Sequence, residues 1–381
     1  MVRKWIRVSI FLALAPVLVA QTSSVPASRL SHLRHGINLS EWFAQVYDLD
    51  GYTKKHFESW TTASDIALIK AAGFDHVRLS VNPQPMMDAA HHPGGRDEYF
   101  GYLDAAMKMI LDAGLAVELD MHPDSDFKAR LREDESVERF ADFWRMVAKH
   151  YASSPWDSER IFFEIMNEPE MHDRYRWYGV ESKLAAAIRQ AAPANTILAP
   201  GANWDDDNDM IFLEPLRDPN VIYVFHFYEP HIFTHQGATW GAFYWHWLKG
   251  LHYPSDPANA AQVAATVPDA IHRLDVIRYG QDHWDASRVE AEINQAADWA
   301  SRNGVPLVCN EFGVYRHADP QDRVAWIKDV RTSLERHNIG WAMWDYSTDS
   351  AGDGFGVAIK KDGKNATLDS ETVNALGLKM P

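Results

Sequence analysis

The chain has 381 residues, of which 46% are hydrophobic and 24% charged. These proportions are typical of globular proteins and exclude a disordered, collagen-like or coiled-coil protein. The 53 acidic and 37 basic side chains give a net charge of −16, so the chain lacks a general means of neutralising phosphates, and we expect no nucleic-acid partner. The single cysteine, Cys309, excludes an intrachain disulfide and a multi-cysteine metal site.

The N-terminal residues have the pattern of a secretory signal peptide. Three basic side chains precede an apolar run over residues 8–19, and Ala20 is small enough for cleavage after it. The run is shorter than the roughly 20 residues that span a bilayer, although a signal anchor is the alternative interpretation. We therefore expect residues 1–20 to be removed, residues 21–31 to form a short polar linker, and the mature protein to be secreted or periplasmic without membrane association.

Beyond this linker, short β-branched runs alternate with helical segments. The alternation is typical of parallel strands joined by crossover helices. Eight such repeats within residues 32–381 fit a single catalytic domain with the α/β fold of a (β/α)₈ TIM barrel, although an open doubly wound sheet gives a similar pattern. The expected strands are His35–Leu39, Asp75–Ser80, Leu115–Met121, Ile161–Met166, Thr196–Pro200, Val221–Phe227, Pro306–Glu311 and Ile339–Asp345.

Capping residues set the expected ends of the helices. Ser64 can cap a helix that ends before Gly73. Asp285 can cap a helix that runs to Arg302, with Gly304 just beyond it. No glycine-rich loop follows the first strand, so the sequence does not favour a dinucleotide-binding Rossmann fold.

One connection is much longer than usual. Residues 229–284 form an insertion between the sixth strand and its helix, and they contain many aromatic side chains. The insertion can form a subdomain with a small hydrophobic core of its own, and its rings can also line a cleft at the C-terminal face of the barrel. The rings considered as cleft walls are those of Trp240, Trp245 and Trp247.

Two glutamates lie directly at strand ends, where a buried carboxylate is costly without partners. Glu168 ends the fourth strand and Glu311 the seventh, and these strands can face each other across a barrel. Retaining glycosidases use two carboxyl groups about 5–5.5 Å apart, of which one attacks the sugar and the other protonates the leaving oxygen. Arg78 can keep the attacking carboxylate ionised. Either glutamate alone is also explained as a salt-bridged loop carboxylate.

Polar and aromatic motifs recur where the expected strands end, as Val77-Arg78-Leu79-Ser80, Asp120-Met121-His122, Asn167-Glu168-Pro169, His226-Phe227-Tyr228, Asn310-Glu311-Phe312-Gly313 and Trp344-Asp345. In these motifs the sequence resembles glycoside hydrolase family 5, which contains many cellulases. The resemblance covers essentially the whole mature chain and implies a (β/α)₈ barrel. Eight recurrent active-site positions of that family have counterparts here, namely Arg78, His122, Asn167, Glu168, His226, Tyr228, Glu311 and Trp344.

The resemblance also implies the roles of the catalytic residues. Glu168 would be the general acid/base and Glu311 the nucleophile. Asn167 would bind the 2-hydroxyl of the reacting sugar, an interaction that can strengthen in the transition state. Tyr228 and Arg78 would hold the nucleophile in line for attack.

The other positions would bind substrate or support the acid/base. The resemblance places His226 near the acid/base and implies that His122 binds sugar hydroxyls. Trp344 would form the floor beneath the reacting sugar. Asn38 and Trp204 are weaker subsite candidates.

We expect neither a metal ion nor another cofactor. His122 lies near Asp120 and Asp124, but no further histidine falls at metal-ligand spacing. Strand alternation puts Cys309 on the same side of its strand as Glu311, two residues deeper, where we expect a small buried core residue rather than a nucleophile.

The sequence therefore predicts a secreted retaining β-glycan hydrolase. The resemblance favours an endo-β-1,4-glucanase, a cellulase that acts as a monomer on a neutral polysaccharide. A β-mannanase, an exo-β-1,3-glucanase or a xylanase of the same family is the alternative, and a transglycosylase shares every residue named above. Alternatives of other classes are a metal-dependent hydrolase and a non-catalytic carbohydrate-binding barrel, although the latter would need one of the two glutamates replaced.

Overall fold

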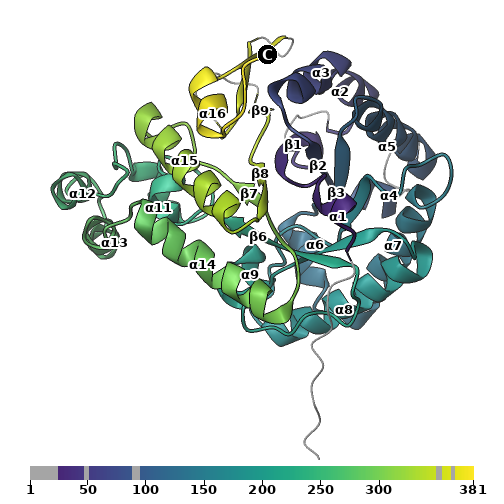
Figure 1. The fold of residues 1–381 in the computed structure, drawn as a ribbon. Helices are drawn as coiled ribbons and strands as arrows, with labels where there is room; N and C mark the ends of the chain where they lie inside the picture. Colours follow the sequence, from purple (N-terminus) through teal and green to yellow (C-terminus); the bar gives the residue numbers. More distant parts are fainter. Residues whose placement is uncertain (1–24, 47–50, 88–94, 349–353, 362–364) are drawn as a thin grey trace, which may run out of the picture.

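Eight parallel strands close into a barrel in the computed structural model, which describes residues 25–46, 51–87, 95–348, 354–361 and 365–381. The strands pair in sequence order, and the last strand pairs with the first. Figure 1 shows helices surrounding this barrel. The predicted (β/α)₈ barrel is confirmed and the open doubly wound sheet is excluded, because an open sheet leaves two strands unpaired at its edges. The predicted signal peptide lies outside the described residues.

The eight barrel strands agree closely with the expected ones. The first strand is longer than expected, because it continues to Phe43. The fifth and sixth strands have the expected bounds, and the other five differ by one or two residues at their ends. The strands are β1 (His35–Phe43), β2 (His76–Val81), β3 (Ala116–Met121), β4 (Ile161–Glu164), β5 (Thr196–Pro200), β6 (Val221–Phe227), β7 (Leu307–Phe312) and β8 (Gly340–Met343).

Long helices cover the outside of the barrel, and shorter helices occupy the connections. A small sheet formed by β9 (Ser347–Thr348), β10 (Ala358–Lys361) and β11 (Asn365–Leu368) follows the eighth strand. The helices before β6 are α1 (Ala27–Leu30), α2 (Lys54–Ser59), α3 (Ala63–Ala72), α4 (Gln84–Met87), α5 (Gly95–Asp112), α6 (Ser125–Arg130), α7 (Asp134–Tyr151), α8 (Arg174–Ala191), α9 (Ala202–Asp205) and α10 (Asp207–Met210). Those after β6 are α11 (His231–Thr234), the 3₁₀ helix η2 (Phe243–Trp247), α12 (Pro257–Ala264), α13 (Ala270–Gln281), α14 (Ala286–Asn303), α15 (Pro320–Arg336) and α16 (Ser370–Ala375).

Local sequence explains where these helices begin and end. The prediction that Ser64 caps α3 is wrong, because Thr62 and Asp65 form a reciprocal capping box two residues earlier. Asp285 caps α14 as predicted, and Gly304 ends it in the left-handed conformation that favours glycine.

The barrel interior is apolar at the amino ends of its strands and polar at the carboxyl ends. The polar end buries Arg78 together with Glu118 and Glu164, each 0% exposed. Such charges are stable in a core only when they are paired, so the functional site rests on an ion-pair network. The apolar end is filled by Leu33, Ala116, Phe162, Leu198, Ile222, Val224 and Val308.

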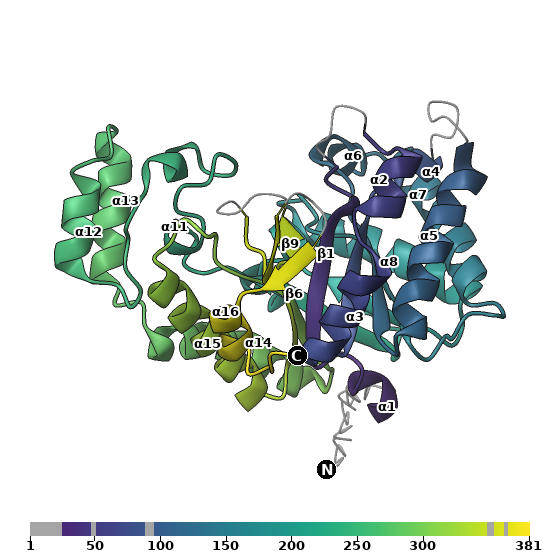
Figure 2. The ribbon, with the colours of Figure 1, turned by 90° about the horizontal axis from the view of Figure 1, so that it is seen from above.

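The described part of the predicted linker is structured. Residues 27–30 form α1, which lies close to the described N-terminus (Figure 2). Arg29 is buried there and donates hydrogen bonds to Thr196 Oγ1 at 3.0 Å and to Glu159 Oε2 at 3.1 Å. The segment just before β1 is therefore part of the folded domain.

The long connection after β6 contains the helical pair α12 and α13. Figure 2 shows this pair standing at one edge of the molecule, away from the barrel strands. Its buried side chains, among them Val263, Val276 and Tyr279, belong to the same hydrophobic cluster as the barrel. The insertion thus extends the main core instead of forming a separate one. No helix in the described part of the chain is long and apolar enough to cross a membrane.

We expect Gly36→Ala to destabilise the barrel. Gly36 pairs with His76 across β1 and β2, and an added Cβ would overlap the His76 ring, which is fully buried and hydrogen-bonded to Asp75 at 2.6 Å. Overpacking of this kind costs about 1–3 kcal/mol. The measurement is the free energy of unfolding in urea.

Gly179→Ala is the matched control for this prediction. Gly179 lies within α8, and nothing lies within 4 Å of a Cβ added there. Alanine should stabilise that helix by about 0.5–1 kcal/mol. Equal unfolding free energies for the two variants would contradict the packing argument.

Candidate active site

A cleft opens over the carboxyl ends of the barrel strands, and most of the predicted site residues line it. One half has a volume of about 660 Å³ and the other about 700 Å³. The two halves share Glu168, Tyr228, His231, His235 and Trp240, so they form one continuous depression. Predicted site residues in its lining are His122, Asn167, Glu168, Trp204, His226, Tyr228, Glu311 and Trp344.

Arg78 lies beneath this cleft and is completely buried. Its guanidinium binds Glu164 in a bidentate manner, with Nε 2.6 Å from Oε2 and Nη2 2.7 Å from Oε1. Nη1 donates to Glu311 Oε1, and Nη2 lies 3.1 Å from Asp120 Oδ2. Burial alone would lower the pKa of Arg78, but the charges of Asp120, Glu164 and Glu311 raise it well above its ordinary value. Arg78 is therefore a permanent cation under the site.

Glu311 is held by donors on both carboxylate oxygens. Oε1 accepts from Arg78, and Oε2 accepts from the Tyr228 hydroxyl at 3.0 Å. Hydrogen bonds that involve a charged group are among the stronger ones, so these two donors hold the carboxyl group firmly. His226 Nδ1 also lies 3.4 Å from Oε2. These contacts fix the orientation of the Glu311 carboxyl group, which faces the cleft.

A register shift in β7 turns Glu311 toward the barrel interior. Phe225 of β6 pairs with Cys309, whereas the next residue, His226, pairs with Glu311, so Asn310 is an extra residue. Such a bulge breaks the alternation of strand side chains. The prediction that Cys309 shares the side of Glu311 is wrong, because Cys309 packs in the cluster between strands and helices. Its expected role as a small buried residue agrees with its complete burial.

Glu168 follows β4 with a positive φ of 43°, which is uncommon for a residue other than glycine. Its backbone N–H donates to Asp205 Oδ2 at 2.8 Å, and its Oε1 lies 3.1 Å from His226 Nδ1. About 30% of its side chain is exposed to the cleft. One oxygen of Glu168 and one of Glu311 lie within 4.8 Å of each other and of a nitrogen of His226.

His226 holds the proton of its pair with Glu168. Burial lowers the pKa of His226, but Glu311, Asp205 and Glu168 together raise it to about 9. Burial raises the pKa of Glu168, but the hydrogen bond and charge of His226 lower it to about 2. Without substrate, the proton of the pair therefore sits on His226, one hydrogen bond away from Glu168.

His122 is a neutral base in the floor of the cleft. Burial and then the charge of Arg78 lower its pKa to about 3. Its Nδ1 lies 2.8 Å from Asp120 Oδ2, and its Nε2 lies 3.2 Å from Asn167 Nδ2. Its ring stacks on that of Trp344 with centroids 5.8 Å apart. The cleft floor is thus fixed by packing and hydrogen bonds before any substrate binds.

The two weaker subsite candidates differ in whether they reach the cleft. Asn38 is fully buried, and its amide donates to the carbonyl of Asn310 at 3.0 Å and accepts from Arg78 at 2.9 Å. It does not line the cleft, so the structure does not support its expected place as a subsite. Trp204 lines the second half of the cleft and is 43% exposed.

Of the three tryptophan rings of the insertion predicted as cleft walls, two line the cleft and one does not. Trp240 and Trp245 line the cleft, as predicted for cleft walls. The ring of Trp247 packs instead on that of Phe243, with centroids 5.3 Å apart, and against the main core.

Comparison with known proteins agrees with this geometry. Residues 40–350 match the family model described as Cellulase (glycosyl hydrolase family 5). The chain belongs to glycosyl hydrolase family 5. It is 30% identical over 319 residues to Endoglucanase C of Acetivibrio thermocellus, which covers 82% of this chain and 90% of that protein. It is 26% identical to Cellodextrinase A of Ruminococcus flavefaciens over 80% of this chain and 82% of that protein.

Several solved structures superpose on the chain. The endoglucanase Cel5A of Thermotoga maritima is 27% identical, with a TM-score of 0.71 over 91% of this chain and 98% of that chain. The cellulose synthase subunit Z of Clostridioides difficile has a TM-score of 0.71 at 24% identity, covering 90% of this chain and 99% of that chain, which supports the fold alone. The protein is therefore a family 5 glycoside hydrolase.

Several residues of the site carry no clear signal in the sequence. Glu164 lies four residues before Glu168, and only the barrel shows that it faces Arg78. Asp205 stands in a run of three aspartates that reads as an ordinary polar loop. His231 begins α11 and His235 directly follows it, and both line the two halves of the cleft, where the sequence predicts only an insertion.

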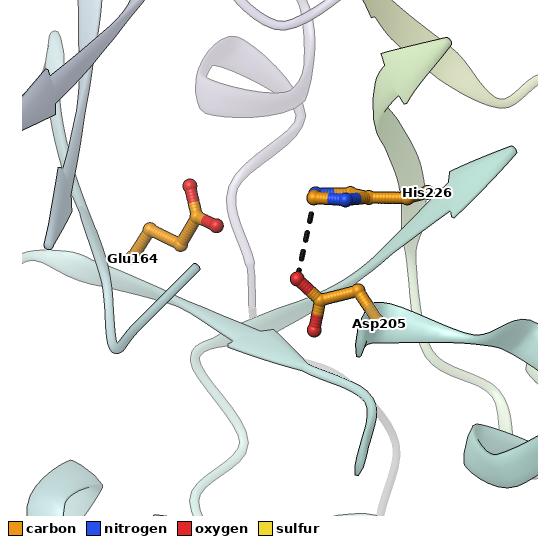
Figure 3. A group of neighbouring side chains, drawn as sticks. All are labelled: Glu164, Asp205 and His226. Carbon is orange, nitrogen blue, oxygen red and sulfur yellow. Dashed lines mark ion pairs between the residues drawn. The ribbon is translucent and has the colours of Figure 1, made fainter. Parts of the chain in front are cut away.

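Two groups of side chains in the described residues have the spacing of metal ligands. Glu164, Asp205 and His226 are one group, and Figure 3 shows them converging from different elements. Glu168, His226 and Glu311 are the other. Arg78 takes both oxygens of Glu164 and one of Glu311, so neither group offers three free ligands. The residues fit an ion-pair network better than a metal centre.

We expect His226 to make stability depend on pH above neutrality. Its pKa is raised from 6.5 to about 9 on folding, so its stabilising contribution is complete below pH 6.5 and is lost as pH rises through 9. The free energy of unfolding should fall between these values, and His226→Gln should flatten that fall. His246→Gln, at an exposed histidine of η2, is the control and should leave the slope unchanged. A slope in His226→Gln equal to that of the unsubstituted protein would contradict the assignment.

Proposed function

We propose that this family 5 hydrolase is a secreted endo-β-1,4-glucanase that cleaves by double displacement. The observation that carries the mechanism is the approach of Glu168 and Glu311, whose oxygens come within 4.8 Å. Retaining glycosidases place their carboxyl groups about 5–5.5 Å apart, whereas inverting enzymes need roughly 6.5–9.5 Å to admit a water molecule. The short separation of the two carboxyl groups favours a mechanism that retains the configuration at the anomeric carbon.

In the first step, Glu311 attacks the anomeric carbon and forms a glycosyl ester. Arg78 and Tyr228 hold the two oxygens of Glu311, so the carboxylate is oriented before the sugar arrives. Glu168 donates a proton to the departing glycosidic oxygen. That proton is available because His226 holds one at hydrogen-bonding distance from Glu168 Oε1.

In the second step, water hydrolyses the ester. Glu168 is then ionised and removes a proton from the water as its oxygen attacks the anomeric carbon, and Glu311 leaves as a carboxylate. Two inversions give net retention at the anomeric carbon. Asn167 lines the cleft beside Glu168 and would hydrogen-bond the sugar there, and Trp344 offers a ring face in the half of the cleft that contains Glu311.

The shape of the cleft supports internal cleavage of a polymer. Its two halves meet at Glu168, so sugar units can bind on both sides of the scissile bond. Trp204 and Trp245 line the half of the cleft that does not contain Glu311. Such rings can stack on the sugar units of the leaving group, beyond the scissile bond. Endoglucanase C and Cel5A, named as endoglucanases, support a β-1,4-glucan as substrate.

A β-mannanase is the second candidate. Structures of Cel5A from Thermotoga maritima are described in complex with cellobiose and with mannotriose. A related cleft therefore accommodates both sugars, which differ in configuration at carbon 2.

We also propose that residues 1–20 direct export and that the mature enzyme acts as a monomer. The net charge of −16 suits a neutral polysaccharide better than an anionic one, because the enzyme would repel polyanions.

We expect Glu311→Ala to reduce kcat by roughly 10⁴-fold or more, because no other side chain can form the glycosyl ester. Glu371→Ala, at an exposed glutamate of α16, should retain the kcat of the unsubstituted enzyme. The measurement is release of reducing ends from a soluble β-glucan, with melting curves to show that both variants fold. Substantial turnover by Glu311→Ala would remove the nucleophile assignment.

We expect the enzyme to release mixed-length oligosaccharides from carboxymethyl cellulose and lichenan, with viscosity falling faster than reducing ends appear. A panel that also contains glucomannan, xylan and laminarin distinguishes the candidates. Faster cleavage of mannan than of glucan would replace the glucanase proposal with the mannanase. If laminarin were the only substrate cleaved and single sugars the only product, the proposed endo-β-1,4 action would be overturned.

A further inference from the structure

Asp205 occupies an unusual backbone position behind the acid/base. It ends α9, and three consecutive residues there, Asn203, Trp204 and Asp205, have φ values of 56°, 66° and 57°. Residues other than glycine rarely adopt this left-handed conformation, and a run of three needs support from its surroundings. The result is that Trp204 faces the cleft while the Asp205 carboxylate turns inward and is completely buried.

The Asp205 carboxylate contacts both the acid/base Glu168 and its partner His226. Its Oδ2 accepts the backbone N–H of Glu168 at 2.8 Å. The same oxygen lies 3.4 Å from His226 Nε2, and Figure 3 marks this ion pair. Burial raises the pKa of Asp205 well above its ordinary value, against the opposing effects of the His226 charge and the Glu168 N–H bond. An anionic Oδ2 therefore depends on these two donors, and it is suited to accept a proton donor from the imidazole.

Both nitrogens of His226 therefore face carboxylate oxygens. Nε2 faces Asp205, while Nδ1 lies 3.1 Å from Glu168 Oε1 and 3.4 Å from Glu311 Oε2. A neutral imidazole carries only one proton, and the nitrogen that holds it is set by the hydrogen bond on that side of the ring. With the proton on Nε2, Nδ1 is an acceptor for a protonated Glu168. With the proton on Nδ1, it would instead donate to an ionised Glu168.

We propose that Asp205 is a positioning residue that keeps a proton on His226 Nε2, so that Nδ1 remains free to exchange the catalytic proton with Glu168. The pair then holds its acidic proton as Glu168–H···Nδ1 or as Glu168⁻···H–Nδ1⁺, and the two forms differ only by a shift along one hydrogen bond. The inference rests on the proposed role of Glu168 and adds the residue that sets the tautomer of its partner.

Other charged groups around His226 do not replace Asp205. Glu311 faces Nδ1 and is already held by Arg78 and Tyr228. Glu164 and Asp120, the other carboxylates near His226, are bound to Arg78 at 2.6 and 3.1 Å. Among the described residues, only Asp205 forms an ion pair with Nε2.

The test is Asp205→Asn, which keeps the shape of the side chain and removes its charge. With cellotetraose, whose leaving oxygen needs a proton, the alkaline limb of kcat/KM should move to lower pH by about one unit. With 2,4-dinitrophenyl β-cellobioside, whose leaving group needs no proton, kcat/KM should stay within about threefold of the unsubstituted enzyme. Asp209→Asn is the matched control, because Asp209 lies in the following helix and pairs with Arg174 at 2.7 Å; its pH profile should be unchanged.

An unchanged alkaline limb in Asp205→Asn, or equal losses on the two substrates, would overturn the proposal. Nitrogen-15 NMR of His226 in the unsubstituted enzyme gives an independent answer if the variant does not fold. Nε2 should stay protonated while Nδ1 titrates, and a neutral ring with its proton on Nδ1 would contradict the proposal. Failure of the enzyme to cleave either substrate would instead refute the proposed function, so the two failures are distinguishable.

Discussion

The site depends on the burial of one cation inside the barrel. Arg78 lies within hydrogen-bonding distance of Glu164 and Glu311 and close to Asp120. A guanidinium in a core is costly without anions, and carboxylates there are equally costly without a cation, so neither side of the network can change alone. Because one guanidinium joins the structural carboxylate Glu164 to the candidate nucleophile, the stability of the barrel and the charge of the active site have a common origin.

Irregular backbone then aims the reactive groups. The extra residue in β7 turns Glu311 inward, a positive φ orients Glu168, and the left-handed run of residues 203–205 ends at Asp205. Each feature departs from regular strand or helix geometry at the carboxyl ends of the strands. Regular secondary structure supplies the frame, and these local departures bring carboxylates from three separate segments around His226.

The sequence predicts the frame well because alternating strands and helices have strong periodic signals and eight of them close a barrel. The sequence also singles out Glu168 and Glu311 as catalytic candidates, because a carboxylate buried at the end of a strand is costly without partners. It does not predict the register shift that separates Cys309 from Glu311, because strict alternation is the only rule available from one strand. Asp205 is missed for a similar reason, since its role depends on contacts with residues distant in the chain.

Retention at the anomeric carbon is the central claim, because it follows from the separation of the two glutamates. The most direct measurement is proton NMR of the first product released from a soluble β-1,4-glucan, recorded before the anomers equilibrate. The account predicts that the β-anomer appears first and the α-anomer grows in later by mutarotation. Initial release of the α-anomer would show inversion and would contradict nucleophilic attack by Glu311.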